Sequence, residues 1–284
     1  MGEIARPQFS NVDQWGLTHT GKVRTENQDH FFLGALAHGI QMVRTSISEA
    51  GRRVLHPERL ATLYMVADGV GGRAGGEEAA RLAVLDLLSS VSKSFYRADY
   101  AEADDPEVFS RLLHDAALAC HESLLGRVGP KGSEPGFATT LTLFLGLWPH
   151  AYLLQVGDSR GYIYQNDELT QISRDQTWAQ DLIDAGTLTR TAANASKWAN
   201  VLSSAIGAQQ AAPVVTRVTR DWGAVVLICS DGLTRHVSDQ RIEERLSTMR
   251  NARETAELLL QDALDGGGSD NITLIVGRTI RPVE

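Results

Sequence analysis

Short uninterrupted runs of apolar residues recur along the chain, and runs of this length predict buried β-strands. The clearest are 62–67, 140–147, 151–156, 223–229 and 271–277. Residues 29–34, DHFFLG, predict one more strand at the edge of a sheet. None of these runs approaches the roughly 20 apolar residues that a membrane-spanning helix needs.

Longer segments with apolar residues at helical spacing lie between the strands. One helix is expected to begin near Gly76, where Glu77 and Glu78 suit the positive end of its dipole. The apolar faces expected are Ala80, Val84, Leu87, Leu88 and Val91 in that helix, Val108, Leu112, Ala116 and Ala119 in a helix over 107–125, and Ala256, Leu259, Leu260 and Ala263 in a helix over 252–264. Clustered strands with paired helices between them predict a layered α+β fold with largely antiparallel sheets.

Composition limits the classes of protein to consider. The 284 residues are 43% hydrophobic, and the net charge of −8 argues against a nucleic-acid binder, which usually has a basic face. Residues 1–10 lack the apolar core of a secretory signal, and Cys229 lies in a predicted buried strand. We therefore expect no disulfide framework, no membrane anchor and a reducing, cytoplasmic setting. The loops at 100–107, 126–136 and 265–270 are too short to be linkers between independent domains.

Four aspartates stand where the predicted buried strands meet loops. They are Asp68, Asp158, Asp231 and Asp270. One Asp-Gly pair after a strand is ordinarily a turn, but four such acids surrounded by glycine, serine and asparagine are expected to gather at one rim of the sheet. Grouped carboxylates repel one another unless a cation lies between them, and ligands that are all oxygen suit Mg²⁺ or Mn²⁺.

The segment VADGVGGRAGGEEAA, residues 66–80, is unusually rich in glycine directly after Asp68. Glycine lets the backbone approach a ligand closely, and a carbonyl such as that of Gly69 can itself bind an ion. No pattern typical of zinc, of an EF-hand or of a P-loop occurs in the chain. Two hard ions bridged by aspartates are a known arrangement for hydrolysing phosphate esters, so this chemistry is our first hypothesis.

Eight motifs in order give the chain its resemblance to a known family. They are GKVRTENQD (21–29), VADGVGGRAGGEEAA (66–80), GFATTLTL (136–143), LLQVGDSRGYIY (153–164), ISRDQTW (172–178), NVLSSAIG (200–207), LICSDGL (227–233) and SDNITLIV (269–276). From about residue 15 to 277, the chain resembles the metal-dependent protein phosphatases (PPM, protein phosphatase 2C-like), and the bacterial serine/threonine branch in particular.

The resemblance implies a role for each matching residue. Asp68 would bridge two Mn²⁺ or Mg²⁺ ions, and the Gly69 carbonyl, Asp231 and Asp270 would complete the direct protein ligands. Asp29 would hold metal-bound water. Asp158, with Asp231, would help to form a possible third metal site. Arg24 would bind the substrate phosphate through its planar fork of donors.

The resemblance also implies a fold and an activity. The fold would be a four-layer αββα sandwich of two antiparallel sheets, in a single domain over 10–280 with a substrate-adjacent flap at about 176–200. The activity would be hydrolysis of phosphoserine and phosphothreonine by a water or hydroxide bridging two ions, with Arg24, Asp68 and Asp231 as the catalytic residues. The expected partners are phosphorylated proteins, including a Ser/Thr kinase and its substrates, for a monomeric enzyme.

Three features depart from the family pattern. Val70 stands where some members carry a histidine proposed as general acid, so the leaving oxygen must take its proton from metal-bound water or another group. Arg73 and Gln176 replace histidines that many bacterial members have. Residues 35–61 form an insertion that is either a solvated surface extension or a basic lip for phosphopeptides, since it carries Arg44, Arg52, Arg53 and Arg59.

Two other functions remain open on the sequence alone. One is a pseudophosphatase that binds phosphoproteins without turnover, although such proteins typically lose the metal aspartates. The other keeps the fold but acts on regulatory targets such as anti-sigma-factor antagonists.

Some neighbouring residues favour structural roles. We expect Arg160 to pair with a nearby acid, and Thr139 and Thr140 to pack in the core. Asp175 either ties the flap to the site or caps the flap's helix.

Overall fold

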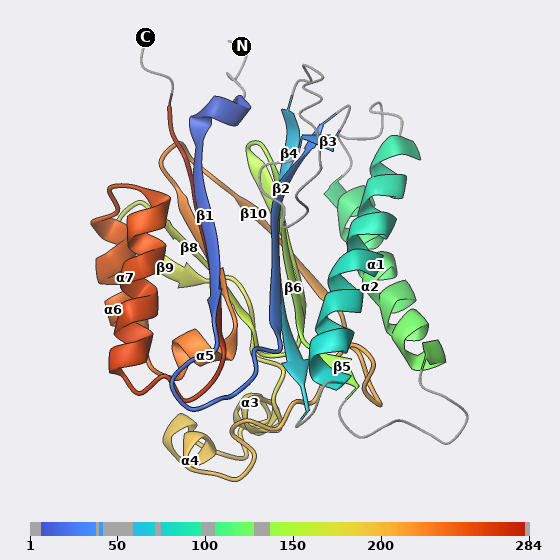
Figure 1. Cartoon of the computed structure of the whole chain (residues 1–284), viewed down its shortest axis with the longest axis vertical. Coiled ribbons are helices and arrows are strands. Elements are labelled where there is room, and N and C mark those ends of the chain that lie inside the picture. The colour runs from blue at the N-terminus through green and yellow to red at the C-terminus, as the bar shows by residue number, and fades with distance from the viewer. Residues whose placement is uncertain are drawn as a thin grey trace.

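Two antiparallel β-sheets pack face to face, and helices cover the outer face of each sheet (Figure 1). The computed structural model describes residues 7–37, 40–41, 59–71, 75–97, 106–127 and 137–281. A 3₁₀ turn over Phe9–Asn11 precedes the first strand. This four-layer arrangement confirms the αββα sandwich expected from the sequence.

The first sheet has the strand order β1-β12-β11-β8-β9. Its strands are β1 (Val12–His19), β8 (Arg160–Gln165), β9 (Glu168–Gln171), β11 (Val225–Cys229) and β12 (Ile272–Thr279). Helices α6 (Asp239–Ser247) and α7 (Ala252–Asp265) pack on its outer face, and α5 (Asp231–Thr234) follows β11 directly.

The second sheet has the order β10-β7-β6-β4-β2-β3. Its strands are β2 (Asp29–Ala37), β3 (Ile40–Gln41), β4 (Arg59–Val70), β6 (Leu141–Leu147), β7 (His150–Val156) and β10 (Val214–Thr219), and β5 (Ala138–Thr139) pairs with the end of β4. Helices α1 (Gly75–Arg97) and α2 (Pro106–Arg127) cover it. Two short helices, α3 (Trp178–Asp184) and α4 (Arg190–Asn194), lie at the lower end in Figure 1.

The centre of strand β4, residues 63–67, is apolar at every position because both of its faces are buried. Leu63 and Met65 face the core beneath the helices, whereas Tyr64 and Val66 face the core between the sheets. A strand buried on both faces needs a continuous apolar run rather than alternation. The structure confirms strands in all five predicted ranges, 62–67, 140–147, 151–156, 223–229 and 271–277.

Among the described strands, residues 29–34 pair with β4 alone, as expected of an edge strand, whereas residues 35–36 of β2 also pair with the short β3. Helix α2 has the expected extent, but its buried face differs in part from the prediction. Its buried residues are Phe109, Leu113, Ala116, Ala117, Cys120 and Leu124, whereas Ala119 is exposed. Ala116 is buried and Leu112 packs against the core, as predicted, whereas Phe109, which packs against Tyr152 of β7, is not in the predicted face.

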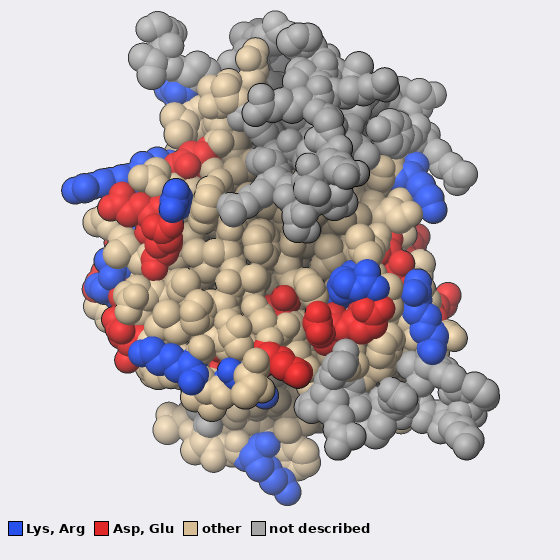
Figure 2. All heavy atoms as spheres, in the orientation of Figure 1, with Lys and Arg blue, Asp and Glu red and all other residues tan. Residues whose placement is uncertain are grey.

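The insertion over 35–61 lies mostly outside the described residues, as does Arg73, so the hypothesis of a basic lip stays a prediction. Both cysteines are buried and free. No helix within the described ranges is long and apolar enough to cross a membrane. Figure 2 shows acidic and basic side chains in mixed groups on the visible face.

Candidate active site

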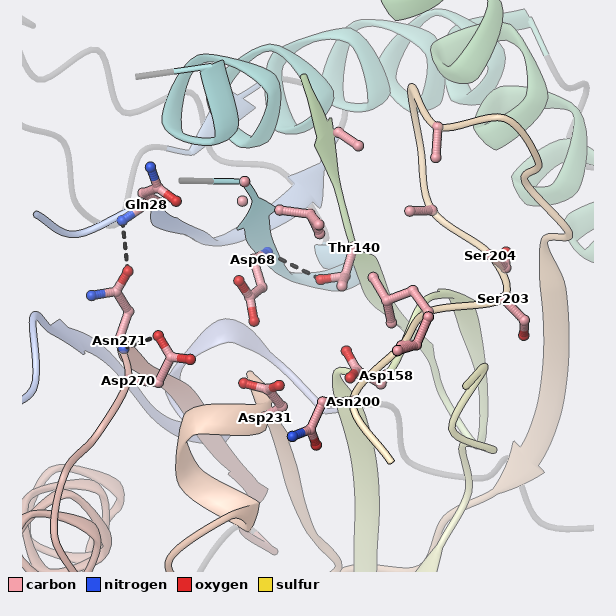
Figure 3. A pocket seen from close by; sticks show the side chains of 18 of the residues that line it. Gln28, Asp68, Thr140, Asp158, Asn200, Ser203, Ser204, Asp231, Asp270 and Asn271 are labelled. Atoms are coloured by element: carbon pink, nitrogen blue, oxygen red, sulfur yellow. Dashed lines mark hydrogen bonds between the residues drawn. The ribbon is translucent and has the colours of Figure 1, made fainter. Parts of the chain in front are cut away.

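A cavity of about 790 Å³ opens at one end of the sandwich, and the four aspartates singled out in the sequence all line it. Asp68 comes from the end of β4, Asp158 from the β7–β8 connection, Asp231 from the start of α5 and Asp270 from just before β12. Their carboxyl groups face a common space in Figure 3. The sequence predicted one rim of one sheet, but both sheets contribute, because β4 and β12 belong to different sheets.

Hydroxyl groups of a buried threonine pair fix the backbone at Asp68. The Asp68 N–H donates to Thr140 Oγ1 at 3.0 Å, and its carbonyl accepts from Thr139 Oγ1 at 2.9 Å. Thr140 Oγ1 also bonds to Ser159 Oγ at 2.9 Å. Both threonines are buried, as predicted, and their hydroxyl groups also hydrogen-bond to the backbone of Asp68. They therefore orient Asp68 in addition to packing the core.

Asp29 is a buried carboxylate beside Asp68 on the neighbouring strand, where the two residues are register partners. Ser230 Oγ donates to Asp29 Oδ2 at 2.8 Å, and Asp29 Oδ1 has no hydrogen-bond partner within the described structure. Burial raises the pKa of Asp29 to about 6, against hydrogen bonds from Thr273 and Ser230 that lower it. A buried, unpaired carboxylate oxygen is costly unless a donor such as water or a cation reaches it.

Gln176 fixes the turn that carries Asp158. Its Oε1 accepts from the Gly157 N–H at 2.8 Å, and its Nε2 donates to the Ala212 carbonyl at 2.8 Å. Gly157 has a φ of 107°, and a Cβ there would lie 2.6 Å from Thr140 Cγ2, so only glycine fits. The glutamine found in place of the family's histidine thus holds the loop next to Asp158.

The glycines after Asp68 allow a close approach of backbone segments. A Cβ on Gly69 would clash with the carbonyl oxygens of Gly76 and Gln28, and Gly71 has a φ of 137°. Gly69 also lines the cavity. Gly69 and Gly71 therefore let the backbone at the end of β4 lie against the site.

Arg24 reaches the site from the loop between β1 and β2. Its Nε lies 2.8 Å from Asp270 Oδ1, and its Nη2 donates to Asp270 Oδ2 at 2.9 Å. Buried Asn271 holds this loop, since its Nδ2 donates to the Thr20 and Glu26 carbonyls and its Oδ1 accepts from the Gln28 N–H. The sequence analysis missed Asn271, although an asparagine at the entry to a buried strand was an available signal.

A second arginine that the sequence analysis missed also reaches the aspartates. Arg235, which follows α5, pairs with Asp231 through Nη2 and donates from Nη1 to Asp270 Oδ2 at 2.9 Å. Its position four residues after Asp231 places it one helical turn away, where an ion pair forms readily. That spacing was the signal in the sequence.

Burial and the charges of neighbouring acids raise the pKa values of Asp68, Asp158 and Asp231. Burial is the largest cause for Asp68, whose pKa lies well above its ordinary value, and the charges of Asp29 and Asp231 add to it. Burial and the charge of Asp231 raise the pKa of Asp158 to about 8. The pKa of Asp231 is also raised by burial, although Arg235 opposes the shift. A cation bound between such neighbouring acids would stabilise their ionised form and lower their pKa values.

The donor set fits hard divalent cations. The carboxylates and the Gly69 carbonyl supply only oxygen, and one Asp29 oxygen lacks a partner. Within the ranges described, no three Asp, Glu, His or Cys side chains are arranged to hold an ion as they stand. Two guanidinium groups lie among these acids, so an ion bound by Asp231 and Asp270 would have to displace them.

The expected flap borders the cavity. Trp178 and Val201 line it, are 49% and 39% exposed, and are joined by the Trp178 N–H to Val201 carbonyl bond. Arg160 pairs with Asp175 at 2.7 Å, as expected. Thr177, rather than Asp175, caps α3, so the alternative that Asp175 caps the helix is wrong. Asp175 instead ties the start of the flap to β8.

Comparisons with known proteins agree with this architecture. A family model described as protein phosphatase 2C matches residues 54–266. The serine/threonine protein phosphatase PstP of Mycobacterium tuberculosis is 35% identical over 223 residues, which are 78% of this chain and 41% of PstP. The chain thus spans about two fifths of the length of that relative.

Two further comparisons cover more of the related chain. The serine/threonine phosphatase stp of Listeria innocua is 30% identical over 215 residues, which are 75% of this chain and 83% of stp. A solved structure of the PstP catalytic domain in complex with two manganese ions matches with a TM-score of 0.67 at 28% identity, covering 95% of this chain and 99% of that one. The chain therefore belongs to the protein phosphatase 2C family of protein phosphatases, as its motifs indicated.

Proposed function

We propose that this protein hydrolyses phosphoserine and phosphothreonine in proteins, using two Mn²⁺ or Mg²⁺ ions. The observation that carries the proposal is the convergence of Asp68, Asp231 and Asp270 from two sheets on one cavity that Arg24 also lines. The manganese ions in the PstP structure support the same chemistry for this chain. When bound, the ions supply an activated water for in-line attack on phosphorus and neutralise charge on the phosphoryl oxygens.

The chain's own residues divide the remaining work. Asp68 would bind both ions, because it is the most central of the acids and its backbone is fixed by Thr139 and Thr140. The Gly69 carbonyl, Asp231 and Asp270 would complete the protein ligands. Each is held by a strand end or a helix start, which keeps the ligand positions precise.

Asp29, Asp158 and Arg24 would act around these ligands. The unpaired Oδ1 of Asp29 would accept a hydrogen bond from water at the ions. Asp158 would help to bind a third ion together with Asp231, since the two carboxylates are near enough for the charge of Asp231 to raise the pKa of Asp158. Arg24 would bind the phosphate of the substrate through two of its N–H groups.

No titratable side chain stands at position 70, where Val70 lines the cavity. The proton for the leaving oxygen of serine or threonine would therefore come from solvent at the site. The activity should accordingly rise from mildly acidic to alkaline pH as the attacking water loses its proton near neutrality. A profile that is flat across that range would contradict this mechanism.

The direct test is hydrolysis of p-nitrophenyl phosphate and of a phosphothreonine peptide, with Mn²⁺ and with a chelator. We expect turnover that requires the metal and is lost in D231N, whereas D221N, which changes an exposed aspartate outside the cavity, should keep it. Absence of metal-dependent turnover by folded wild-type protein would refute the proposal. Partner binding by such a silent protein would instead favour the pseudophosphatase alternative.

Phosphorylated proteins, among them a Ser/Thr kinase and its substrates, are the proposed partners, and the names of the relatives support this class. We also propose that the chain acts in the cytoplasm as a monomer and that residues 10–280 form a single domain. A strong preference for phosphotyrosine peptides over phosphoserine and phosphothreonine peptides would count against the substrate class.

A further inference from the structure

Arg235 makes an unusual pair of contacts at the centre of the candidate site. Its guanidinium contacts Asp231 through Nη2 and Asp270 Oδ2 through Nη1, and these are its side-chain partners among the described residues. Both carboxylates are proposed metal ligands. A guanidinium and a divalent ion cannot both contact the same carboxylate oxygens at the same time, because their positive charges repel each other.

Arg24 and Arg235 converge on the same carboxylate. Arg24 contacts both oxygens of Asp270, and Arg235 contacts Oδ2. Two guanidinium forks around one small planar anion form an arrangement that also suits a phosphate, which offers more acceptor oxygens and more charge. In this structure, the Asp270 carboxylate occupies the place of such an anion between the two arginines.

The position of Arg235 limits where its side chain can go. It is 32% exposed, lines the cavity and follows directly on α5, which Asp231 begins. If ions bind Asp231 and Asp270, the guanidinium loses its partners but stays at the cavity wall. Asp158 and Asp68 also lie near enough to interact with its charge, but both belong to the proposed ion site, so an anion that enters the cavity is the partner left to the guanidinium, and in a phosphatase that anion is the substrate phosphate.

We propose that Arg235 is a second phosphate-binding residue, which pairs with Asp231 and Asp270 in the metal-free protein and binds the substrate phosphate when ions displace it. This inference rests on the proposed function, since it assumes metal ions at the aspartates and a phosphate in the cavity. It makes metal binding and phosphate binding interdependent. The ions release Arg235 for phosphate, and removal of Arg235 removes a competitor of the ions.

Binding measurements with inorganic phosphate and Mn²⁺ test this inference independently of turnover. We would titrate phosphate into Mn²⁺-loaded protein, and Mn²⁺ into metal-free protein, for wild type, R235Q, R235K and R241Q. Arg241 is the matched control, because it also bridges two acids, Glu244 and Asp262, but lies outside the cavity.

R235Q should bind phosphate about tenfold more weakly than wild type, the expected loss for one charged hydrogen bond. It should bind Mn²⁺ at least as tightly as wild type, since no guanidinium must be displaced. R235K keeps the charge without the planar fork, so its phosphate affinity should fall between the two. In turnover of p-nitrophenyl phosphate, R235Q should raise KM more than it lowers kcat, and R241Q should resemble wild type.

Unchanged phosphate affinity in R235Q would overturn the inference. So would weaker Mn²⁺ binding together with a lower melting temperature, because that pattern means that Arg235 only holds the acids in place. If R235Q does not fold, wild-type phosphate affinity in R235K would overturn the inference in its place. Failure of the proposed function has a different signature, since it abolishes metal-dependent turnover in the wild type whatever the effect of R235Q on binding.

Discussion

Asn271 offers the most quantitative test of how the site is built. Its side chain makes three hydrogen bonds to one loop, at 3.0 Å to the Thr20 carbonyl, 2.8 Å to the Glu26 carbonyl and 2.9 Å from the Gln28 N–H. Asn271 is 7% exposed. The loop carries Arg24, so N271A should lower both the stability of the fold and the affinity of the site for phosphate.

The magnitude follows from these contacts. Each bond contributes about 1 kcal/mol net, which gives at most about 3 kcal/mol for the three. Water can reach part of the exposed loop, so we expect N271A to lower the free energy of unfolding by about 2 kcal/mol. For a chain of this size, that loss corresponds to a fall of roughly 4–8 °C in melting temperature.

The assay combines urea unfolding in the presence of a chelator with kinetics in Mn²⁺. We expect kcat/KM of N271A to fall about tenfold, as for loss of one charged contact to phosphate. N251A is the matched control. Asn251 caps α7 through the Glu254 N–H, so its loss should cost about 1 kcal/mol of stability without changing kcat/KM.

A double-mutant cycle with R24A decides whether Asn271 acts through the loop. If it does, adding N271A to R24A should reduce kcat/KM little further. Losses that multiply in the double variant, or an N271A protein as stable as wild type, would refute the reasoning. Mn²⁺ affinity should stay near the wild-type value in N271A, because none of the three hydrogen bonds of the Asn271 side chain involves Asp270.

Three further results are expected. W178A should raise KM for a phosphopeptide more than for p-nitrophenyl phosphate, because Trp178 lines the cavity and is half exposed. W198A, which changes an exposed tryptophan outside the cavity, should leave KM for both substrates unchanged. Equal effects of W178A and W198A would contradict this prediction. In a chelator, the melting temperature should fall from about pH 5 to about pH 8. The folded protein has pKa values of about 6 for Asp29 and about 8 for Asp158, above the ordinary 3.8, and the stability contributed by a raised carboxyl pKa is lost as the pH rises through that pKa. A melting temperature that is constant or rises over this range would be inconsistent with these pKa values. Burial raises the pKa of both cysteine thiols to about 12, so a thiol reagent should label them only after unfolding, and fast labelling of native protein would count against the described core.

The sequence predicted the elements whose signal is local. Residues 63–67 of β4 are buried on both faces and are therefore apolar, and Asp68 stands out because it follows that run. Strand β1 was missed, because residues 12–19 mix polar and apolar positions and owe their conformation to pairing with β12 at the other end of the chain. The burial of Phe109 in α2 likewise involves a tertiary contact, its packing against Tyr152.

The same distinction holds at the site. Asp68, Asp158, Asp231 and Asp270 were predictable as acids at strand ends, but their division between two sheets was not, since it depends on topology. The contact of Arg235 with Asp270 joins segments 35 residues apart, and no local pattern shows it. The sequence pattern thus predicted the acids that gather at the cavity, whereas the contacts that orient and neutralise them, such as that of Arg235 with Asp270, depend on the tertiary structure.

The pairing of β1 with β12 has a practical consequence for handling the protein. Val12 pairs with Thr279 at one end of this ribbon, whereas His19 pairs with Ile272 at the other, two residues from Asp270. Seven residue steps of extended strand, about 23 Å, therefore separate the outer end of the ribbon from the end beside the cavity. Purification tags, fluorophores or surface linkers joined beyond residues 12 and 279 would begin at the end of the ribbon away from Asp270, so the cavity that Asp270 lines should stay open to large ligands.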